Sequence, residues 1–391
     1  MKRKLLVLIV AILSVSLILT GCLNNDEQEK TEPLTVENAW IATKNTTRIN
    51  SSDPYQMAVL TSQTLWTTGE NNRPGGVIIV NPEDWQVAAV STNLIHFPNN
   101  GPVLYAKDDS IPKITLDELK RLNPKGSIEN NGVQVILVGE FNNKSVQQIE
   151  ELGFKVDTII ASNPYDYAKQ IDAYYAEAAG SYPASVIIGS GEAAPYTLPA
   201  VNWIAHSPEP LLLVKENEVP QETQEALEAR NGDANIYILG PESVISSAVE
   251  EQLSKYGKVE RISGDDPFEN AIAFSKYTDP VTRFGWAITT PGHNVSMVIL
   301  ESSSLAIAAS PFSHLGKHAP LLWTEKEGMP DSVMNYLMSI QPKYKISPAE
   351  GPYNHAWIIG GEDQINYQGQ VEIDDMLEII SGTGQGGHSG H

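Results

Sequence analysis

The chain from residue 48 to residue 379 alternates short apolar runs with longer segments in which apolar residues recur every three or four positions. Runs such as Val77–Val80 and Val186–Ile188 predict buried strands, and the segments between such runs predict amphipathic helices. All-apolar strands are typical of parallel sheets that are covered on both faces. We therefore expect an α/β protein made of Rossmann- or flavodoxin-like three-layer units with parallel sheets.

Residues 235–277 show this alternation most clearly. The run Ile236–Leu239 predicts one strand, and Val259–Ile262 predicts the next. Between the two runs, apolar residues on one stripe predict a helix that is capped by Ser243 and ends at Gly257. The stretch is therefore expected to fold as strand, helix and strand before another helix opens.

A motif that predicts the start of a helix occurs three times. An Asp or Asn precedes a proline and an aromatic residue follows it, in Asp53-Pro54-Tyr55, Asn163-Pro164-Tyr165 and Asp266-Pro267-Phe268. The Asp or Asn side chain can cap the helix, and proline suits the first helical position. In the last copy Glu269 stands where a capping box needs an acid. The nearly equal spacing of the prolines indicates three copies of one unit.

Two further motifs recur at similar intervals. One is a Pro-Leu-Leu type segment, found as Pro102–Tyr105, Pro210–Leu213 and Pro320–Trp323. The other is an apolar run that stops at a glycine, found as Val135–Gly139, Ile236–Gly240 and Ala356–Gly360. The repeats are therefore expected at residues 48–156, 157–260 and 261–379.

The junction of the second and third repeats resembles the cell-wall-binding repeat of type 2, which is found in bacterial surface-layer and secreted proteins. The matching positions are Gly240, Ile245, Ser246, Arg261, Ile262, Gly264, Asp266, Phe268, Glu269 and Ala271. Pro241 and Pro267 depart from the family pattern, and its Pro-Asp-Ala-Leu segment is replaced by unlike residues. The resemblance implies three units with pseudo-threefold symmetry, and non-covalent binding of a secondary, anionic cell-wall polymer.

The same resemblance implies that the Pro-Leu-Leu segments contact the polymer. The candidates there are Pro102, Leu104, Tyr105, Pro210, Leu212, Pro320, Leu322 and Trp323. Arg48 and Arg261 are further candidates, and the middle repeat has Thr158 at their position. The competing interpretation is structural: buried strands for the segments, and an ion pair for the arginines where one repeat meets the next.

Residues 1–21 have the pattern of a secretory signal peptide, with basic residues at positions 2–4 and an apolar run at 5–19. The end of this stretch resembles a lipobox, which implies that Cys22, the sole cysteine, becomes a diacylated N-terminus. An ordinary signal peptide or an N-terminal anchor helix is the alternative. Residues 22–47 are expected to be a lipid-anchored tether and lead-in, and residues 380–391 a disordered Gly/His tail.

Composition and motifs exclude several functions. The chain has 26 Lys and Arg against 48 Asp and Glu, a net charge of −22, so we expect no nucleic-acid binding. Gly189–Gly191 lacks the rest of a dinucleotide fingerprint, and Ser190 lacks a nucleophile elbow. His314 and His318 are four residues apart, a spacing at which two histidines on a helix can bind one metal ion, but the glycine between them argues against a regular helix. His206 lies in an apolar run, so we interpret it as a structural histidine. We expect no catalytic residue, no cofactor and no metal.

The sequence therefore predicts a non-enzymatic surface lipoprotein that is attached by its lipid to the outer face of the cytoplasmic membrane and binds cell-wall polysaccharide. A scaffold whose repeats have lost polymer affinity and bind a protein instead is one alternative. A solute-binding lipoprotein with an interdomain cleft is another, although three repeats rather than two lobes disfavour it.

Overall fold

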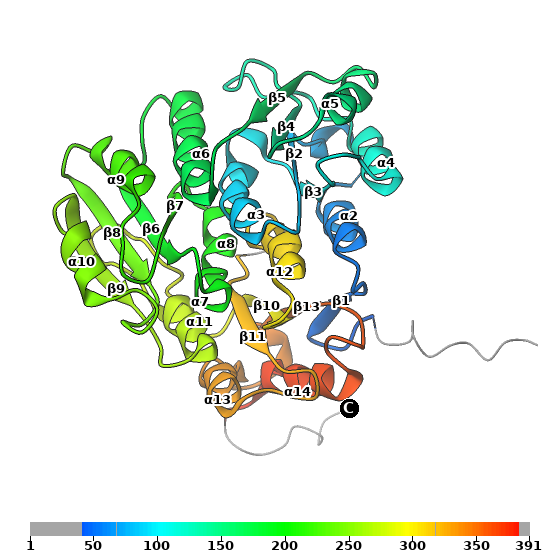
Figure 1. The fold of residues 1–391 in the computed structure, drawn as a ribbon. Coiled ribbons are helices and arrows are strands. Elements are labelled where there is room, and N and C mark those ends of the chain that lie inside the picture. The colour runs from blue at the N-terminus through cyan, green and yellow to red at the C-terminus, as the bar shows by residue number, and fades with distance from the viewer. Residues whose placement is uncertain (1–40, 68, 317, 383–391) are drawn as a thin grey trace, which may run out of the picture. The chain divides into compact units, whose positions relative to one another are not determined.

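Three four-stranded sheets form the framework of the computed structural model, which describes residues 41–382 except residues 68 and 317 (Figure 1). Neighbouring strands in all three sheets run parallel. The predicted α/β fold with three flavodoxin-like units is therefore confirmed. The predicted signal peptide, Cys22 and the start of the tether lie outside the described residues, as does the end of the tail.

The three sheets have the same strand order, in which one edge strand comes from the start of the next unit. The first sheet is β3 (Val103–Tyr105), β2 (Val77–Val80), β4 (Val135–Val138) and β5 (Val156–Ile159). The second is β7 (Leu211–Val214), β6 (Ser185–Ser190), β8 (Ala234–Leu239) and β9 (Gly257–Ile262). The third is β11 (Leu321–Thr324), β10 (Asn294–Ile299), β13 (His355–Ile359) and β1 (Thr46–Ile49).

The strand β1 closes the chain into a ring of units, because it pairs with β13 near the other end of the sequence. Its register places Arg48 opposite Ile358 and Ile49 opposite Ile359. The strands β5 and β9 occupy the same edge position in the first and second sheets. A short extra sheet joins β12 (Lys343–Tyr344) to β14 (Ile380–Ser381).

Helices cover these sheets and connect successive strands (Figure 1). In the first unit they are α2 (Pro54–Leu65), α3 (Trp85–Ser91), α4 (Lys113–Leu122) and α5 (Asn143–Glu150). In the second they are α6 (Pro164–Ala179), α7 (Ala194–Thr197), α8 (Pro199–Ile204), α9 (Gln221–Glu228) and α10 (Ser247–Leu253). In the third they are α11 (Pro267–Lys276), α12 (Ser303–Ala309), α13 (Asp331–Ser339) and α14 (Tyr367–Leu377).

Short helical turns extend two of these helices. The turns η3 (Thr92–Leu94) and η4 (Ile95–Asn99) follow α3, and η5 (Ser310–Ser313) follows α12. Two others, η2 (Glu70–Asn72) and η6 (Pro348–Glu350), lie in loops.

The helix-opening motif caps its helix in all three copies, but the capping box expected at Glu269 is not formed, because its carboxylate accepts from the N–H of Asp265 at 3.3 Å rather than from that of Asp266. Asp53 accepts a hydrogen bond from the backbone N–H of Gln56 at 2.8 Å, and Asp266 accepts the equivalent bond from Glu269 at 2.8 Å. Asn163 accepts two such bonds, at 3.0 Å each, at the start of α6. Each cap satisfies backbone donors that the first helical turn leaves free.

The predicted start and end of the helix between β8 and β9 are wrong. Residues after Pro241 form a turn, in which the N–H groups of Val244 and Ile245 bond to the Pro241 carbonyl. The helix α10 therefore begins only after Ser246, which replaces Ser243 as the residue before it. It ends at Leu253, and Gly257 is already the first residue of β9.

The three helices that open with this motif join the units to one another. The helix α2 packs on β3 of its own unit and on α12 of the third unit. The helix α6 packs on β7 and on α3, and α11 packs on β11 and on α7. Each unit therefore contacts the other two, which is the arrangement that pseudo-threefold symmetry requires.

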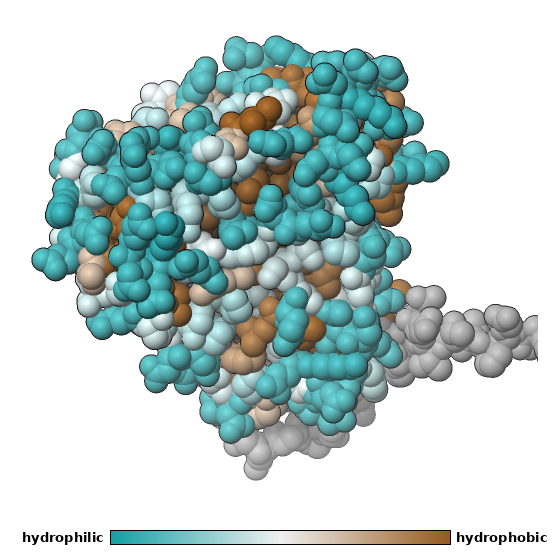
Figure 2. All heavy atoms as spheres, in the orientation of Figure 1, coloured by the Kyte–Doolittle hydropathy of each residue, from teal (hydrophilic) through white to brown (hydrophobic). Residues whose placement is uncertain are grey.

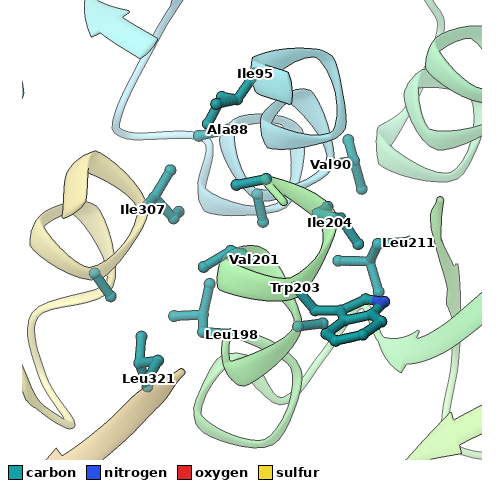
Figure 3. Packing of buried hydrophobic residues seen from close by; sticks show 14 of the residues in the cluster. Ala88, Val90, Ile95, Leu198, Val201, Trp203, Ile204, Leu211, Ile307 and Leu321 are labelled. Atoms are coloured by element: carbon teal, nitrogen blue, oxygen red, sulfur yellow. The ribbon is translucent and has the colours of Figure 1, made fainter. Parts of the chain in front are cut away.

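The middle of the ring is a continuous apolar core between α3, α8 and α12, which we call the axial helices. Figure 3 shows Val90 from α3, Val201 and Ile204 from α8, and Ile307 from α12 lying close to one another. All of them are fully or almost fully buried. Since the same hydrophobic cluster includes residues of all three sheets, the units share one core.

The face of the molecule shown in Figure 2 is mainly polar. Hydrophobic residues appear there in separate small groups. Among the described residues, none of the helices combines the length and the apolar character needed to cross a bilayer.

Candidate functional site

The Pro-Leu-Leu segments are the buried strands β3, β7 and β11 with the residue before each. The predicted contact residues that lie there are all buried, namely Pro102, Leu104, Tyr105, Pro210, Leu212, Pro320, Leu322 and Trp323. The structural interpretation of these segments is therefore confirmed. A polymer contact by these residues stays a prediction. In this structure their side chains are enclosed by protein.

Two of these residues tie neighbouring units together. The hydroxyl of Tyr105, at the end of β3, donates a hydrogen bond to the carbonyl oxygen of Ser304 in α12 at 2.6 Å. The indole N–H of Trp323, at the equivalent place in β11, donates to the carbonyl oxygen of Pro195 in α7 at 2.9 Å. The second unit has Leu213 at this position, which has no polar atom to offer.

The axial helices carry a second set of contacts between units. The side-chain amide of Asn202 in α8 donates to the carbonyl oxygen of Ala319 at 2.8 Å, just before Pro320. In the first unit Asn93 makes a longer bond, 3.4 Å, to the carbonyl oxygen of Glu209, just before Pro210. The residue before the Pro-Leu-Leu segment is thus held by an asparagine of the preceding unit in both places.

Arg48 and Arg261 occupy equivalent places in β1 and β9. The guanidinium of Arg48 donates at 2.8 Å to the Gly360 carbonyl oxygen, and at 2.8 and 3.1 Å to the side-chain oxygen of Gln370. That of Arg261 donates at 2.8 Å to the Gly240 carbonyl oxygen and at 2.7 Å to a carboxylate oxygen of Glu250.

Each arginine therefore fastens its edge strand to the glycine that ends the neighbouring strand and to the helix beyond it. The expected structural ion pair is present for Arg261, whereas the amide of Gln370 replaces the acid at Arg48. Arg48 is 3% exposed, so it presents almost no surface to a ligand. A polymer contact by either arginine stays a prediction.

A pocket of about 710 Å³ opens where the second unit meets the third. Its walls combine indole and imidazole rings with one phenol and two amides, from Trp203, His206, Trp286, His293, Asn294, His318, Tyr353, Asn354 and His355. Pockets of this size with a few polar groups among apolar and aromatic walls are the usual form of small-ligand sites. We therefore take this histidine–tryptophan pocket as the candidate functional site.

The helix α8 and the loop between α11 and β10 position the rings of the pocket. Trp203 lies in α8, and its ring meets that of Trp286 edge to face at 5.0 Å between centroids. His206 follows the same helix, with its ring nearly parallel to that of Trp286 at 6.0 Å. The backbone of Ala287 has a φ of 56°, a left-handed conformation that is uncommon without glycine.

Asn354 fixes the far wall of the pocket. Its side-chain oxygen accepts hydrogen bonds from the backbone N–H groups of Gly292 at 2.7 Å and His293 at 3.2 Å. Its side-chain nitrogen donates to the carbonyl oxygen of Ile340 at 2.8 Å. These three bonds hold the residues just before β10 beside those just before β13.

The indole nitrogen of Trp286 is a buried donor that bonds to no described residue. A buried N–H without an acceptor is costly, and in native proteins it usually meets a water or a ligand. Trp286 lines the pocket, but its indole nitrogen is itself enclosed, so an acceptor oxygen in the pocket would satisfy this donor only after a small shift of the ring.

Burial lowers the pKa of His206 to about 4, with a smaller contribution from the neighbouring imidazoles. Burial also lowers the pKa of His293 below its ordinary value. These two pocket histidines are therefore uncharged at neutral pH, so they can stack and form hydrogen bonds but do not attract an anion.

The sequence interpretation of His206 as structural missed its place in a pocket wall. A signal was available, because His96, His206 and His314 each follow an axial helix shortly before a Pro-Leu-Leu segment. Residues 314–316 form a turn and residue 318 a bend, so the described part of this stretch is not a regular helix, as the intervening glycine predicted. Among the described residues, no three His, Cys, Asp or Glu side chains are already grouped to hold a metal ion.

No known family model matches this chain. It is distantly similar in sequence to two proteins of Bacillus subtilis (strain 168). N-acetylmuramoyl-L-alanine amidase LytC is 24% identical over 233 residues, which cover 59% of this chain and 42% of the amidase. The amidase enhancer is 25% identical over 225 residues, which cover 57% of this chain and 28% of the enhancer. The match thus spans less than half of either relative.

Two solved structures from Clostridium difficile share the fold. Cwp6 has a TM-score of 0.66 at 22% identity, over 85% of this chain and 48% of that chain. Cwp8 has a TM-score of 0.66 at 18% identity, over 86% of this chain and 52% of that chain. The likeness covers most of the described units, so the ring of three sheets is an arrangement that these proteins have in common.

Proposed function

We propose that this protein attaches to the bacterial cell wall by binding a secondary wall polymer non-covalently, and that it is not itself an enzyme. The observation that carries the proposal is the pair of Bacillus subtilis relatives. One is named as an amidase and the other as an amidase enhancer, yet each matches this chain over a part of its length. A region that proteins of different activity share fits attachment better than catalysis.

The named substrate of the amidase points in the same direction. N-acetylmuramic acid is a sugar of the bacterial cell wall, so an N-acetylmuramoyl-L-alanine amidase works at the wall. The similar part of this chain comprises folded repeats that resemble cell-wall-binding repeats. We therefore infer that these repeats bring the protein to the same surface.

The histidine–tryptophan pocket suits a glycan better than a strongly charged ligand. Its rings offer flat apolar faces to a sugar ring, and its imidazoles and the free Trp286 N–H can bond to hydroxyl or acetamido oxygens. Tyr353, 57% exposed, stands at the rim where a longer polymer would leave the pocket. We propose that one or a few sugar residues of the polymer bind here.

The charge of the chain sets the expected response to salt. A protein with a net charge of −22 meets an anionic polymer against long-range repulsion. Repulsion between exposed charges is screened beyond about 8 Å at physiological ionic strength. Binding should therefore hold or strengthen as salt rises, which is the reverse of the behaviour of a basic protein.

The decisive experiment measures co-sedimentation with purified cell walls before and after acid extraction of their polymers. The chain from residue 22 with Cys22→Ser keeps the whole described unit and removes the lipid. We expect binding to intact walls, loss of binding to extracted walls, and weaker binding for Trp286→Phe and Tyr353→Ala. Tyr367→Ala, at an exposed residue outside the pocket, is the matched control and should bind normally.

Equal binding to extracted walls would remove the polymer hypothesis and favour the alternative, a scaffold that binds a wall protein. Normal binding by both pocket variants, with binding still dependent on the polymer, would place the polymer site elsewhere on the repeats.

We further propose that Cys22 carries a lipid that holds the protein at the outer face of the membrane. Two acyl chains are needed for stable attachment, because each buried methylene contributes only about 0.8 kcal/mol. In cells, Cys22→Ser should leave the protein unprocessed or release it from the membrane fraction. Normal processing and full retention of the serine variant would refute the lipid anchor.

A further inference from the structure

Four histidines from all three units converge at the ends of the axial helices. His96 lies in η4, His206 follows α8, and His314 and His318 follow η5. The ring centroids are 4.6 Å apart for His96 and His314, and 4.1 Å apart for His206 and His318. The two pairs meet through His96 and His206, whose centroids are 6.4 Å apart. We call these four residues the axial histidines.

His96 and His314 face each other through the same atom of each ring. Their Nδ1 atoms are 3.0 Å apart. The other nitrogen of His314, Nε2, lies 2.9 Å from the side-chain oxygen of Asn100. An amide oxygen can only accept, so His314 carries its hydrogen on Nε2 and directs the lone pair of Nδ1 at His96.

The spacing of the two rings suits a two-histidine chelate. Imidazole nitrogens bind Zn²⁺ at about 2.0–2.1 Å, so two of them on one ion are separated by roughly 3–3.5 Å. The Nδ1 atoms already have such a separation. His96 needs only to carry its hydrogen on Nε2, the tautomer that frees its Nδ1 lone pair, and no proton leaves the protein.

Asn100 orients the ring of His314 by accepting a hydrogen bond from it. Metal-binding histidines almost always donate their second N–H to an oxygen, which fixes the tautomer and the ring orientation. Asn100 supplies that oxygen, and its φ of 40° shows that the backbone adopts an uncommon left-handed conformation at this residue.

Further candidate ligands lie near the pair of histidines, but they do not yet point at a common metal position. Among the described residues, no three side chains of the metal-binding types surround one point. His318, whose φ of 57° is also left-handed, lies against His206, which in turn lies near His96. A rotation of His206 or His318 toward the pair would supply a third imidazole, and water would complete the coordination shell.

We propose that the axial histidines bind one divalent transition-metal ion of the Zn²⁺ class at the junction of the three units. Imidazole donors suit Zn²⁺, Ni²⁺ and Cu²⁺, whereas Ca²⁺ and Mg²⁺ prefer oxygen ligands. An ion held by His96 and His314 links the first unit to the third, so it fastens the ring of units as well as occupying a site.

The test is calorimetric titration with Zn²⁺, and separately with Mg²⁺, of the chain from residue 22 with Cys22→Ser. His388 and His391 are both changed to Ala, so that the Gly/His tail adds no ligand. We expect one Zn²⁺ ion per chain, a higher melting temperature with Zn²⁺, and no heat with Mg²⁺. Binding should be lost in His96→Ala and in His314→Ala.

Two further variants separate the chelate from a general effect of substitution. Asn100→Gly tolerates the left-handed backbone but removes the oxygen that orients His314, and should weaken binding by about tenfold. His293→Gln changes a histidine that lines the pocket but lies outside the axial group, and should bind as tightly as the parent chain.

The absence of Zn²⁺ binding in the parent chain would overturn the proposal and leave His96 and His314 as a hydrogen-bonded pair. Unchanged stoichiometry and affinity in the folded His96→Ala and His314→Ala variants would overturn it equally. Circular dichroism of each variant without metal establishes that it is folded. Because no wall material is present, the result is independent of the proposed wall binding.

Discussion

The hydroxyl of Tyr105 reaches out of its own sheet and donates a hydrogen bond to the Ser304 carbonyl oxygen in the third unit, at 2.6 Å. Tyr105 is fully buried, so its hydroxyl exchanges water for this one acceptor. The contact gives the Pro-Leu-Leu segment a role in assembling the ring, whether or not the segment also meets a polymer.

Tyr105→Phe should therefore lower the free energy of unfolding by about 1 kcal/mol, the usual value of one buried hydrogen bond. Urea unfolding followed by fluorescence measures this. Tyr55→Phe is the matched control, because the half-buried Tyr55 packs beside Tyr105 but its hydroxyl bonds to no described residue. Equal losses in the two variants would show that the bond to Ser304 contributes nothing.

The two equivalent arginines should differ in their effect on stability. Arg48→Met leaves the Gly360 carbonyl and the Gln370 oxygen without their donors in a buried place, at a cost of about 2–3 kcal/mol. Arg261→Met breaks a bond to the partly exposed Glu250 and should cost about 1 kcal/mol. Urea unfolding of both variants provides the comparison.

Wall binding distinguishes the two roles considered for these arginines. If they are structural only, each folded Met variant should co-sediment with walls as the parent does. A loss of binding by a variant that remains folded would establish the polymer contact.

Among these variants, loss of a buried ion pair in the second unit should lower the free energy of unfolding the most. Asp172 in α6 and Arg230 after α9 are joined by two hydrogen bonds of 2.8 Å, and both side chains are at most 3% exposed. Asp172→Ala leaves the guanidinium buried without its counter-ion and should cost about 3–5 kcal/mol.

The exposed pair Lys215 and Glu218 is the control for this variant, and Glu218→Ala should leave the free energy of unfolding almost unchanged. The double variant Asp172→Ala/Arg230→Met should recover part of the loss, because no charge then remains buried. A double variant less stable than Asp172→Ala would contradict this reasoning.

Acid should destabilise the protein through His206. The pKa of His206 in the folded chain is about 4, below its ordinary value near 6.5 in an unfolded chain. The unfolded chain therefore binds a proton more readily, and stability falls as the pH drops from about 6.5 toward 4.

His206→Gln should reduce this fall by about 1–2 kcal/mol, a value lowered to allow for solvent at the pocket. The measurement is the free energy of unfolding between pH 7 and pH 4.5 in the presence of a chelator. An identical pH dependence in the variant would show that His206 titrates normally in the folded protein.

The sequence by itself determined the local structure of this protein. The caps at Asp53, Asn163 and Asp266 act within one turn, so a few neighbouring residues suffice to predict them. Continuous apolar strands likewise indicated parallel sheets with two covered faces, because that burial requires no knowledge of the partner strand. The error at α10 arose where a local turn at Pro241 competed with helix periodicity.

Only the tertiary structure decided which distant segments meet. The pairing of β1 with β13 joins residues near the two ends of the described chain, and no local pattern encodes that partner. The same pairing buries Arg48, so that its guanidinium bonds to Gly360 and Gln370 within the protein. The convergence of His96, His206 and His314 follows from the packing of three axial helices, because only a closed ring brings three equivalent helix ends to one place.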